Sequence, residues 1–205
     1  NLPMLAMLLE ECGARVVSAA HVGDDPASVA AGVRAALAAA DVALTIGGVS
    51  AGDFDPVKQS LEAAGGAELW RVAMKPGRPQ AFGAPGGKLF FGLPGNPGSV
   101  ACVFETLVRP ALRKWQGFAA LDRPRLEVRA AAAFESRPGR TDFVRATLER
   151  RGGAWWAAPA GEQLSGHLTP QARAHALVIV PEEVERLEPG ASARALLLRW
   201  PGDPA

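Results

Sequence analysis

The sequence has few of the residues that build metal centres or disulfide frameworks. Its only cysteines are Cys12 and Cys102, and both fall on apolar faces of expected helices, where a buried reduced thiol is favoured over a disulfide. Its three histidines have no metal-ligand spacing to a cysteine or to one another. We therefore expect a cytoplasmic protein without structural zinc.

The sequence also has no large excess of positive or negative charge and no long apolar run. The chain has 22 lysines and arginines against 21 aspartates and glutamates, so its overall charge attracts neither nucleic acid nor an anionic membrane. No apolar run approaches the length of a membrane span, and the start at Asn1 does not resemble a signal peptide. We expect no nucleic-acid or membrane partner, and a start without methionine suggests a fragment of a longer chain. Any anion site must be local.

The most informative stretch begins at Asp41 and reads DVALTIGGVSAGDFDP. Residues 42–46 form a short apolar run, which predicts a buried strand, and residues 47–52 form a glycine-rich turn. Asp55 then caps a helix that starts on a proline. Such a turn and helix start direct backbone N–H groups at one point, which suits an anion. Carboxylates at Asp53 and Asp55 would let a divalent cation bridge phosphate and protein.

The order of elements predicts an α/β domain in the first part of the chain. Expected helices cover Pro3–Cys12, a segment from Pro26 through Leu37, and Pro56–Ala64, and expected strands cover Arg15–Ala19 and Val42–Ile46. This alternation argues for parallel strands joined by crossover helices in three layers. Ligands of such sheets bind beyond the carboxyl ends of the strands, where Asp24 and the glycine turn are expected.

The next segment predicts a strand, a cationic loop, a hairpin and a long helix. The loop K-P-G-R-P carries Lys75 and Arg78 and follows a strand over Leu69–Met74. Gln80–Ala84 and Lys88–Leu93 read as the two arms of the hairpin. The motif G-L-P-G-N-P-G-S then leads into a helix over 100–115, which we expect Pro110 to kink and whose start is a second candidate anion site.

The pattern of the sequence changes after Gly117. Short strand-like segments alternate with turn residues, which predicts a small, mostly antiparallel β domain. Its many alanines favour helix and weaken this prediction. We place the boundary near residues 119–124, giving an α/β domain over 1–119 and a β domain over 120–205.

The three motifs T-I-G-G-V-S-A-G-D-F-D, K-P-G-R-P and G-L-P-G-N-P-G-S, in this order and spacing, resemble the molybdopterin molybdenumtransferase family (MoeA in bacteria, the C-terminal part of gephyrin in animals). The resemblance covers nearly the whole chain. It implies a MogA-like three-layer α/β/α molybdopterin-binding domain, whose first strand would precede Asn1, followed by a C-terminal β domain.

The resemblance also implies a reaction. The family takes adenylylated molybdopterin and molybdate, releases AMP with a divalent cation, usually Mg²⁺, and leaves molybdenum on the dithiolene. It implies a homodimer, and a molybdopterin adenylyltransferase as the upstream supplier of substrate.

Site residues follow from the motifs one by one. Asp24 and Asp55 match acidic positions near the metal and the nucleotide, and Lys75 matches a functional lysine; we expect these three to be catalytic and the two aspartates to bind the metal. Ile46 departs from the family, which often has a small polar residue there. The residues expected to bind substrate are Gly47, Gly48, Ser50, Gly52, Arg71, Arg78, Pro94, Gly95, Asn96, Ser99, Arg145 and Ser165.

Simpler interpretations stand beside these. Asp55 is equally well read as a helix cap, Arg71 as half of a surface salt bridge, and Ser99 as a cap. Arg145 and Ser165 rest on the resemblance alone. Two other functions compete: an adenylyltransferase on the same fold, whose turn would read G-G-T-G, and a gephyrin-like scaffold without catalysis.

Overall fold

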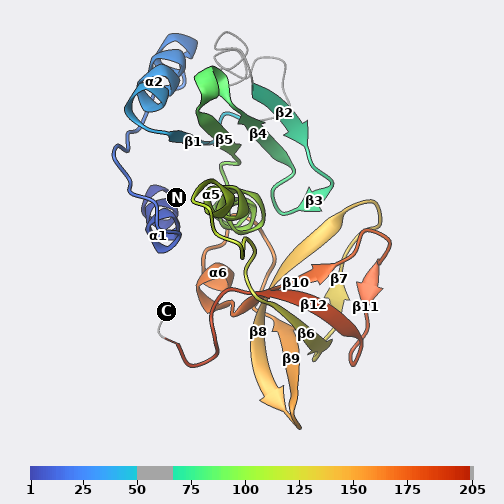
Figure 1. The fold of residues 1–205 in the computed structure, drawn as a ribbon. Helices are drawn as coiled ribbons and strands as arrows, with labels where there is room; N and C mark the ends of the chain where they lie inside the picture. Colours follow the sequence, from blue (N-terminus) through green and yellow to red (C-terminus); the bar gives the residue numbers. More distant parts are fainter. Residues whose placement is uncertain (50–66, 204–205) are drawn as a thin grey trace. The chain divides into compact units, whose positions relative to one another are not determined.

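The computed structural model of the chain describes residues 1–49 and 67–203, and the chain divides into two compact units (Figure 1). The first unit comprises Asn1–Val72 and Gly77–Ala119, and the second comprises Ala73–Pro76 and Ala120–Ala205. Among the described residues, no helix is long and apolar enough to cross a membrane.

The sheet of the first unit has the order β1 (Val42–Ile46), β5 (Leu89–Leu93), β4 (Pro79–Gly83) and β2 (Ala67–Arg71). β1 and β5 are parallel, whereas β4 is antiparallel to both of its neighbours. The predicted hairpin is confirmed, and a 3₁₀ turn at Pro85–Gly87 joins its arms. Parallel pairing, predicted from the alternation of helices and strands before residue 65, holds among the described strands for β1 and β5.

Helices α1 (Leu2–Glu11) and α2 (Pro26–Ala39) are confirmed. Asp25 caps α2, because its Oδ1 accepts the Ser28 N–H at 2.9 Å, and the hydroxyl and amide of Ser28 lower the pKa of Asp25. α2 packs on the sheet through one core cluster, whose buried members are Val33, Ala43, Val49, Ala81 and Phe90. The predicted helix over Pro56–Ala64 lies outside the described residues.

The strand predicted over Arg15–Ala19 is wrong. Residues 14–23 have no regular hydrogen-bonding pattern, and most of Arg15–Ala19 is exposed, including Val17. β-Branched residues such as Val16 and Val17 favour a strand only where a sheet edge is available to pair with them, and no described strand pairs with this segment. The predicted strand over Leu69–Met74 is also divided in two, into β2 and β3 (Met74–Lys75).

The predicted long helix over residues 100–115 is interrupted. It consists of α4 (Pro97–Val103), a π-helical turn (Phe104–Val108) and α5 (Arg109–Trp115). Pro110 lacks an N–H and cannot bond the carbonyl four residues before it, so an altered turn just ahead of it is the expected consequence. The buried apolar face of this helix agrees with the sequence, and Cys12 and Cys102 are both buried and not joined in a disulfide.

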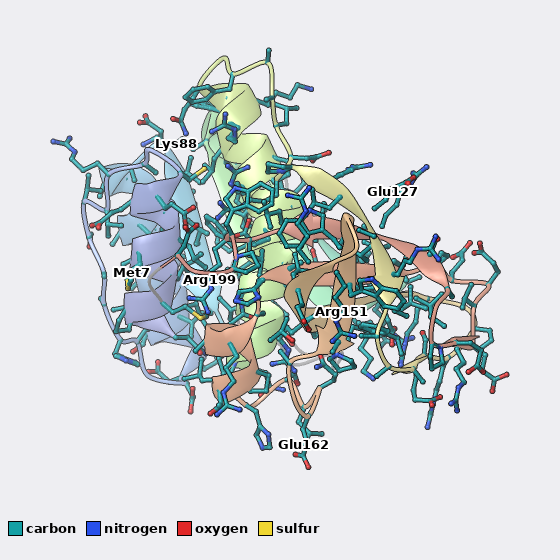
Figure 2. All side chains as sticks on the ribbon, turned by 90° about the horizontal axis from the view of Figure 1, so that it is seen from below. Met7, Lys88, Glu127, Arg151, Glu162 and Arg199 are labelled. Carbon is teal, nitrogen blue, oxygen red and sulfur yellow. The ribbon has the colours of Figure 1, made fainter. Side chains whose placement is uncertain are left out.

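The second unit is a small barrel. Its strands are β6 (Arg125–Ala130), β7 (Phe134–Glu135), β8 (Thr141–Arg151), β9 (Ala154–Pro159), β10 (Ala176–Val180), β11 (Arg186–Leu187) and β12 (Ser192–Leu197), with one short helix, α6 (Thr169–Arg173). The order β10-β12-β6-β9-β8 closes on itself because β10 also pairs with β8. Glu127 and Glu162 point outward from this unit (Figure 2).

Alanine occupies an interior position on each of five strands of this barrel, beside larger apolar residues. Five alanines from five different strands are at most 1% exposed and belong to one core cluster: Ala130, Ala146, Ala157, Ala176 and Ala195. A closed ring of five strands leaves little space inside, so small side chains fit where larger ones would not. The alanines that weakened the strand prediction are therefore a consequence of the closed sheet.

Residues 73–76 belong to the barrel rather than to the first domain, where the sequence placed them. β3 pairs in parallel with β8, with Met74 opposite Thr141 and Lys75 opposite Asp142. The Thr141 N–H also donates to the Ala73 carbonyl at 2.9 Å. This pairing joins segments about 65 residues apart in the sequence, so no local pattern could reveal it.

Candidate functional site

The described part of the glycine turn has the left-handed backbone that glycine alone adopts at no steric cost. Gly47 has φ 84° and Gly48 has φ 67°. The Gly47 N–H donates to the Leu93 carbonyl at 2.9 Å, which continues the β1–β5 pairing one residue past the strand. Val49 then turns back onto the sheet, where it is buried. The turn is thus fixed to the end of β5.

Because β1 and β5 are parallel, their carboxyl ends bring two predicted segments together. Gly95 lies beside Gly47: a methyl group at Gly95 would be 3.9 Å from the Gly47 Cα. The Asn1 Nδ2 donates to the Gly95 carbonyl at 2.5 Å. The Asn96 carbonyl accepts from the amide of Ser99, whose side chain is buried. The structure therefore juxtaposes the residues from the glycine turn and from Pro94–Ser99 that the sequence selected.

Asp24 lies toward the same end of the sheet. Two residues link α2 to β1, so the helix must run back along the strand. The Lys88 Nζ confirms this direction, since it donates to the Leu37 carbonyl in the last turn of α2 at 2.6 Å and precedes the first residue of β5. The first turn of α2, with exposed Asp24 before its cap, is therefore directed toward the carboxyl end of β1.

Part of the predicted site lies outside the described residues. Ser50, Gly52 and Asp55 belong to this part, as does Asp53. Within residues 1–49 and 67–203, no group of three histidine, cysteine or acidic side chains is placed to hold a metal ion. The described residues alone do not fit a magnesium site, and Asp24 is the one predicted ligand among them.

Lys75 is held by the barrel. Its Nζ lies 3.8 Å from the Asp142 Oδ2, and its side chain is 44% exposed, whereas that of Asp142 is 2% exposed. Arg140 contacts the same carboxylate, with Nε 2.8 Å from Oδ1. Arg71 and Arg78, assigned to the first unit, are exposed. The structure therefore pairs Lys75 with a residue that the sequence did not select.

Arg145 is buried, with an exposed fraction of 1%. Its guanidinium donates to the carbonyls of His167 at 3.0 Å and Leu164 at 3.1 Å. These carbonyls flank half-buried Ser165, so Arg145 holds the loop that carries the predicted serine. That Arg145 and Ser165 bind substrate stays a prediction; in the structure Arg145 reaches the loop backbone.

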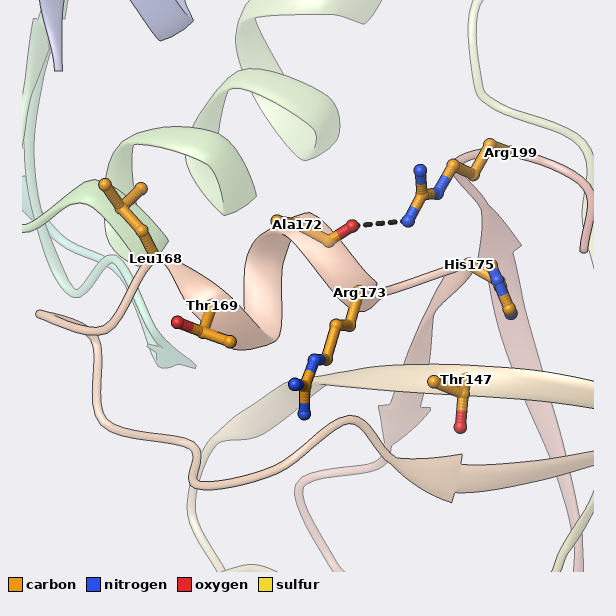
Figure 3. A pocket seen from close by; sticks show the side chains of 7 residues that line it. All are labelled: Thr147, Leu168, Thr169, Ala172, Arg173, His175 and Arg199. Carbon is orange, nitrogen blue, oxygen red and sulfur yellow. Dashed lines mark hydrogen bonds between the residues drawn. The ribbon is translucent and has the colours of Figure 1, made fainter. Parts of the chain in front are cut away.

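A pocket of about 690 Å³ opens on the barrel, and its lining residues are Thr147, Leu168, Thr169, Ala172, Arg173, His175 and Arg199 (Figure 3). Arg199 donates to the carbonyls of Ala172 and Ala174, and the His175 Nδ1 accepts the Leu148 N–H at 3.0 Å. Burial and then the charge of Arg199 lower the pKa of His175, which favours the neutral imidazole. None of the predicted site residues lines this pocket.

Sequence reasoning missed three polar residues that organise the barrel part of the site. Asp142 and Arg140 belong to the same segment as Arg145, P-G-R-T-D-F-V-R, and Gln163 lies two residues before Ser165. The one available signal was a charged residue directly before two apolar ones in an expected strand, since Asp142 precedes Phe143 and Val144. A charge in such a position needs a partner, but the sequence does not say which one.

Two family models match the chain: "Probable molybdopterin binding domain" over residues 1–114 and "MoeA C-terminal region (domain IV)" over residues 127–198. The chain therefore belongs to the family of proteins in which a probable molybdopterin-binding domain is followed by the MoeA C-terminal region. This is the family that the three motifs indicated.

Named relatives agree with this assignment. Molybdopterin molybdenumtransferase 2 of Mycobacterium tuberculosis (strain CDC 1551 / Oshkosh) is 36% identical over 93% of this chain and 48% of its own length. Molybdopterin molybdenumtransferase of Bacillus subtilis (strain 168) is 31% identical over 98% of this chain and 48% of its own length. The chain spans about half the length of these curated relatives.

A solved structure confirms the fold class. The molybdopterin biosynthesis moea protein from Pyrococcus horikosii superposes with a TM-score of 0.82 and 28% identity, over 97% of this chain and 47% of that one. The predicted architecture, an α/β molybdopterin-binding domain followed by a small, mostly antiparallel β domain, is therefore correct.

Proposed function

We propose that this chain is the molybdopterin-binding and C-terminal part of a molybdopterin molybdenumtransferase. In this proposal the enzyme inserts molybdate into adenylylated molybdopterin and releases AMP in a divalent-cation-dependent reaction. The observation that carries the proposal is the likeness to named molybdenumtransferases that runs through both units at 36% identity over 93% of the chain. An adenylyltransferase on the first fold alone would not account for the likeness of the second unit.

The geometry of the first unit supports a role in holding the substrate. The turn at Gly47 and Gly48 lies beside Gly95, and both follow strand ends, where α/β sheets bind their ligands. We assign the phosphate or pterin end of the substrate to this turn and to Ser50, Gly52, Pro94, Asn96 and Ser99. Close approach of a ligand to a backbone of this kind requires residues without large side chains.

The cations of the K-P-G-R-P motif are assigned to the oxyanions. Lys75 is partly exposed, and Arg71 and Arg78 are exposed. Molybdate and phosphate repel each other, and a lysine meets such an anion as a point charge while an arginine can bind it through two N–H groups. We expect the two dithiolene thiols of the substrate to displace one oxygen of molybdate, which leaves as water with the two thiol protons, and a water molecule to cleave the phosphoanhydride and release AMP. No protein nucleophile is needed, and Lys75 neutralises charge in the transition state.

The proposal has further parts: the reaction uses Mg²⁺, the protein is a cytoplasmic homodimer, and a molybdopterin adenylyltransferase supplies its substrate. Asp24 and Asp55 are the proposed ligands of Mg²⁺, which when bound would neutralise phosphate charge and promote release of AMP. No step is assigned to the ion, because the described residues do not form a metal site.

The test is AMP release from adenylylated molybdopterin by the full-length gene product, with and without molybdate. Molybdate-dependent release in the wild type is expected. It should fall at least about tenfold in Asp55→Ala and in Lys75→Met, because each change removes a positioned charge. Lys114→Met is the matched control, since Lys114 is an exposed lysine of α5.

The rival functions predict different outcomes. ATP-dependent adenylylation of molybdopterin would identify an adenylyltransferase. Tight binding of the substrate without release of AMP, whichever oxyanion is added, would leave the fold assignment unchanged and identify a binding or scaffolding role. Equal loss of binding and of AMP release in Asp55→Ala would contradict the role assigned to that residue.

A further inference from the structure

Asp142 is a buried carboxylate that contacts the predicted catalytic lysine. It is the second residue of β8. The Arg140 guanidinium approaches it with Nε 2.8 Å from Oδ1 and its terminal nitrogen 3.5 Å from Oδ2. The Lys75 ammonium lies 3.8 Å from Oδ2. One buried carboxylate therefore holds two cations that come from different segments of the chain.

The backbone places Lys75 and Asp142 on the same face of the sheet. β3 and β8 are parallel, and the register sets Lys75 directly opposite Asp142. Side chains of directly paired residues leave a sheet on the same side. The two side chains thus start as neighbours, and the contact between them needs no distortion of either strand.

The charges and exposures of this cluster are unequal. Asp142 supplies one negative charge, and Arg140 and Lys75 supply two positive ones. Arg140 alone satisfies the carboxylate, because it contacts both oxygens. Lys75 is therefore not needed to balance the charge of the buried Asp142, and its side chain is 44% exposed. The arrangement leaves a tethered ammonium whose charge remains open to an anion.

We propose that Asp142 is a positioning residue for Lys75: it holds the ammonium at the end of β3, ready to receive a tetrahedral oxyanion. A free lysine side chain loses rotamer entropy when it is fixed, and a tether supplied by the fold removes part of that cost from binding. The inference rests on the proposed function, since it takes either molybdate or the phosphate of adenylylated molybdopterin as the anion.

The test is Asp142→Asn in the full-length gene product, with AMP release measured over a range of molybdate and of adenylylated molybdopterin. Displacement of a positioned group by about 1 Å costs on the order of a hundredfold in rate. We expect KM for the anion that Lys75 receives to rise at least about tenfold, and KM for the other substrate to change little. The two titrations therefore distinguish molybdate from the substrate phosphate.

Double substitution tests whether Asp142 acts through Lys75. We expect Lys75→Met to impair release strongly, and Asp142→Asn to add almost nothing once Lys75 has been replaced, because coupled residues are not additive. Independent, multiplicative losses would overturn the proposal. Asp142→Glu, which keeps the charge beside Arg140 but displaces the carboxylate by one methylene, gives the second variant if the asparagine protein does not fold.

A measurement without turnover separates this inference from the proposed function. Relaxation of the ¹³Cε signal of Lys75 in selectively labelled protein, assigned through Lys75→Arg, reports the mobility of the side chain. We expect the Lys75 order parameter to fall in Asp142→Asn and that of exposed Lys114 to stay unchanged. Absence of AMP release in the wild type would defeat the proposed function; an unchanged Lys75 order parameter would defeat the positioning role.

Discussion

The side chain of Gln163 pairs with the backbone of Arg145 as a neighbouring strand would. The Arg145 N–H donates to the Gln163 Oε1 at 3.0 Å, and the Gln163 Nε2 donates to the Arg145 carbonyl at 3.2 Å. The Arg145 guanidinium donates in turn to the backbone of Leu164 and His167. One residue of β8 thus holds the loop of Ser165 through both its backbone and its side chain.

We predict that Gln163→Ala loosens this loop. The substitution removes both hydrogen bonds to the Arg145 backbone and leaves a polar group of β8 without its partner, which costs about 1–3 kcal/mol. Urea unfolding should show this loss of stability, and hydrogen exchange should accelerate in residues 161–168.

Gln171→Ala is the matched control. The Gln171 Oε1 is buried but has no hydrogen-bond partner among the residues that the structure describes. Its removal should cost less than the removal of Gln163. Equal losses, or unchanged exchange in the loop of Gln163→Ala, would show that the loop does not depend on this pair.

Local signals were sufficient for three features of the first unit. The strand before the glycine turn, the Asp25 cap and the hairpin around Pro85–Gly87 were all predictable, because periodicity, caps and turns are properties of adjacent residues. The strand predicted at Arg15–Ala19 failed for the complementary reason. A strand also needs a partner, which its own sequence does not specify.

The same distinction between local and long-range signals applies to the residues of the candidate site. The motifs identified Gly47, Gly95 and Lys75, but not the carboxylate beside Lys75 or the loop carbonyls that Arg145 reaches. Those contacts depend on β8 lying against β3 and on the course of the loop after β9. Such long-range pairings arise from the closure of the barrel, and no spacing in the sequence records them.

We predict that the buried alanine positions of the barrel do not tolerate larger side chains. Ala176 is fully buried, and β10 pairs with β12 on one side and β8 on the other. Ala176→Leu should lower the free energy of unfolding by about 1–3 kcal/mol, because a closed sheet cannot widen locally. Ala119→Leu, on the exposed segment before the barrel, is the control and should be close to neutral in the same urea titration. Equal stability of both variants would contradict a tightly filled interior.

Gly92 leaves space for the glycine turn. A methyl group at Gly92 would lie 2.7 Å from the Val49 Cγ1 and 2.8 Å from the Ala81 Cβ. Gly92→Ala should therefore displace Val49, destabilise the protein by about 1–3 kcal/mol and weaken substrate binding at the adjoining turn. Calorimetric titration and thermal unfolding measure the two effects. Gly166→Ala, where a methyl group would meet no described atom within 4 Å, should change neither.

We predict that the protein loses stability on mild acidification because His175 becomes protonated when the chain unfolds. Burial and the charge of Arg199 hold the pKa of His175 below its ordinary value in the folded protein. In the unfolded chain a histidine titrates near its ordinary pKa of about 6.5, so the unfolded state binds more protons between the two values. The free energy of unfolding should therefore be unaffected above pH about 6.5, fall as pH drops below it, and level off below the folded pKa.

His175→Asn isolates this effect. An asparagine oxygen can still accept the Leu148 N–H that the His175 Nδ1 accepts at 3.0 Å, but it does not titrate. Urea unfolding between pH about 7.5 and about 5 should show a flatter profile for this variant than for the wild type. His21→Asn, at an exposed histidine, should retain the wild-type slope. If both variants fall in parallel with the wild type, the acid sensitivity arises from groups other than His175.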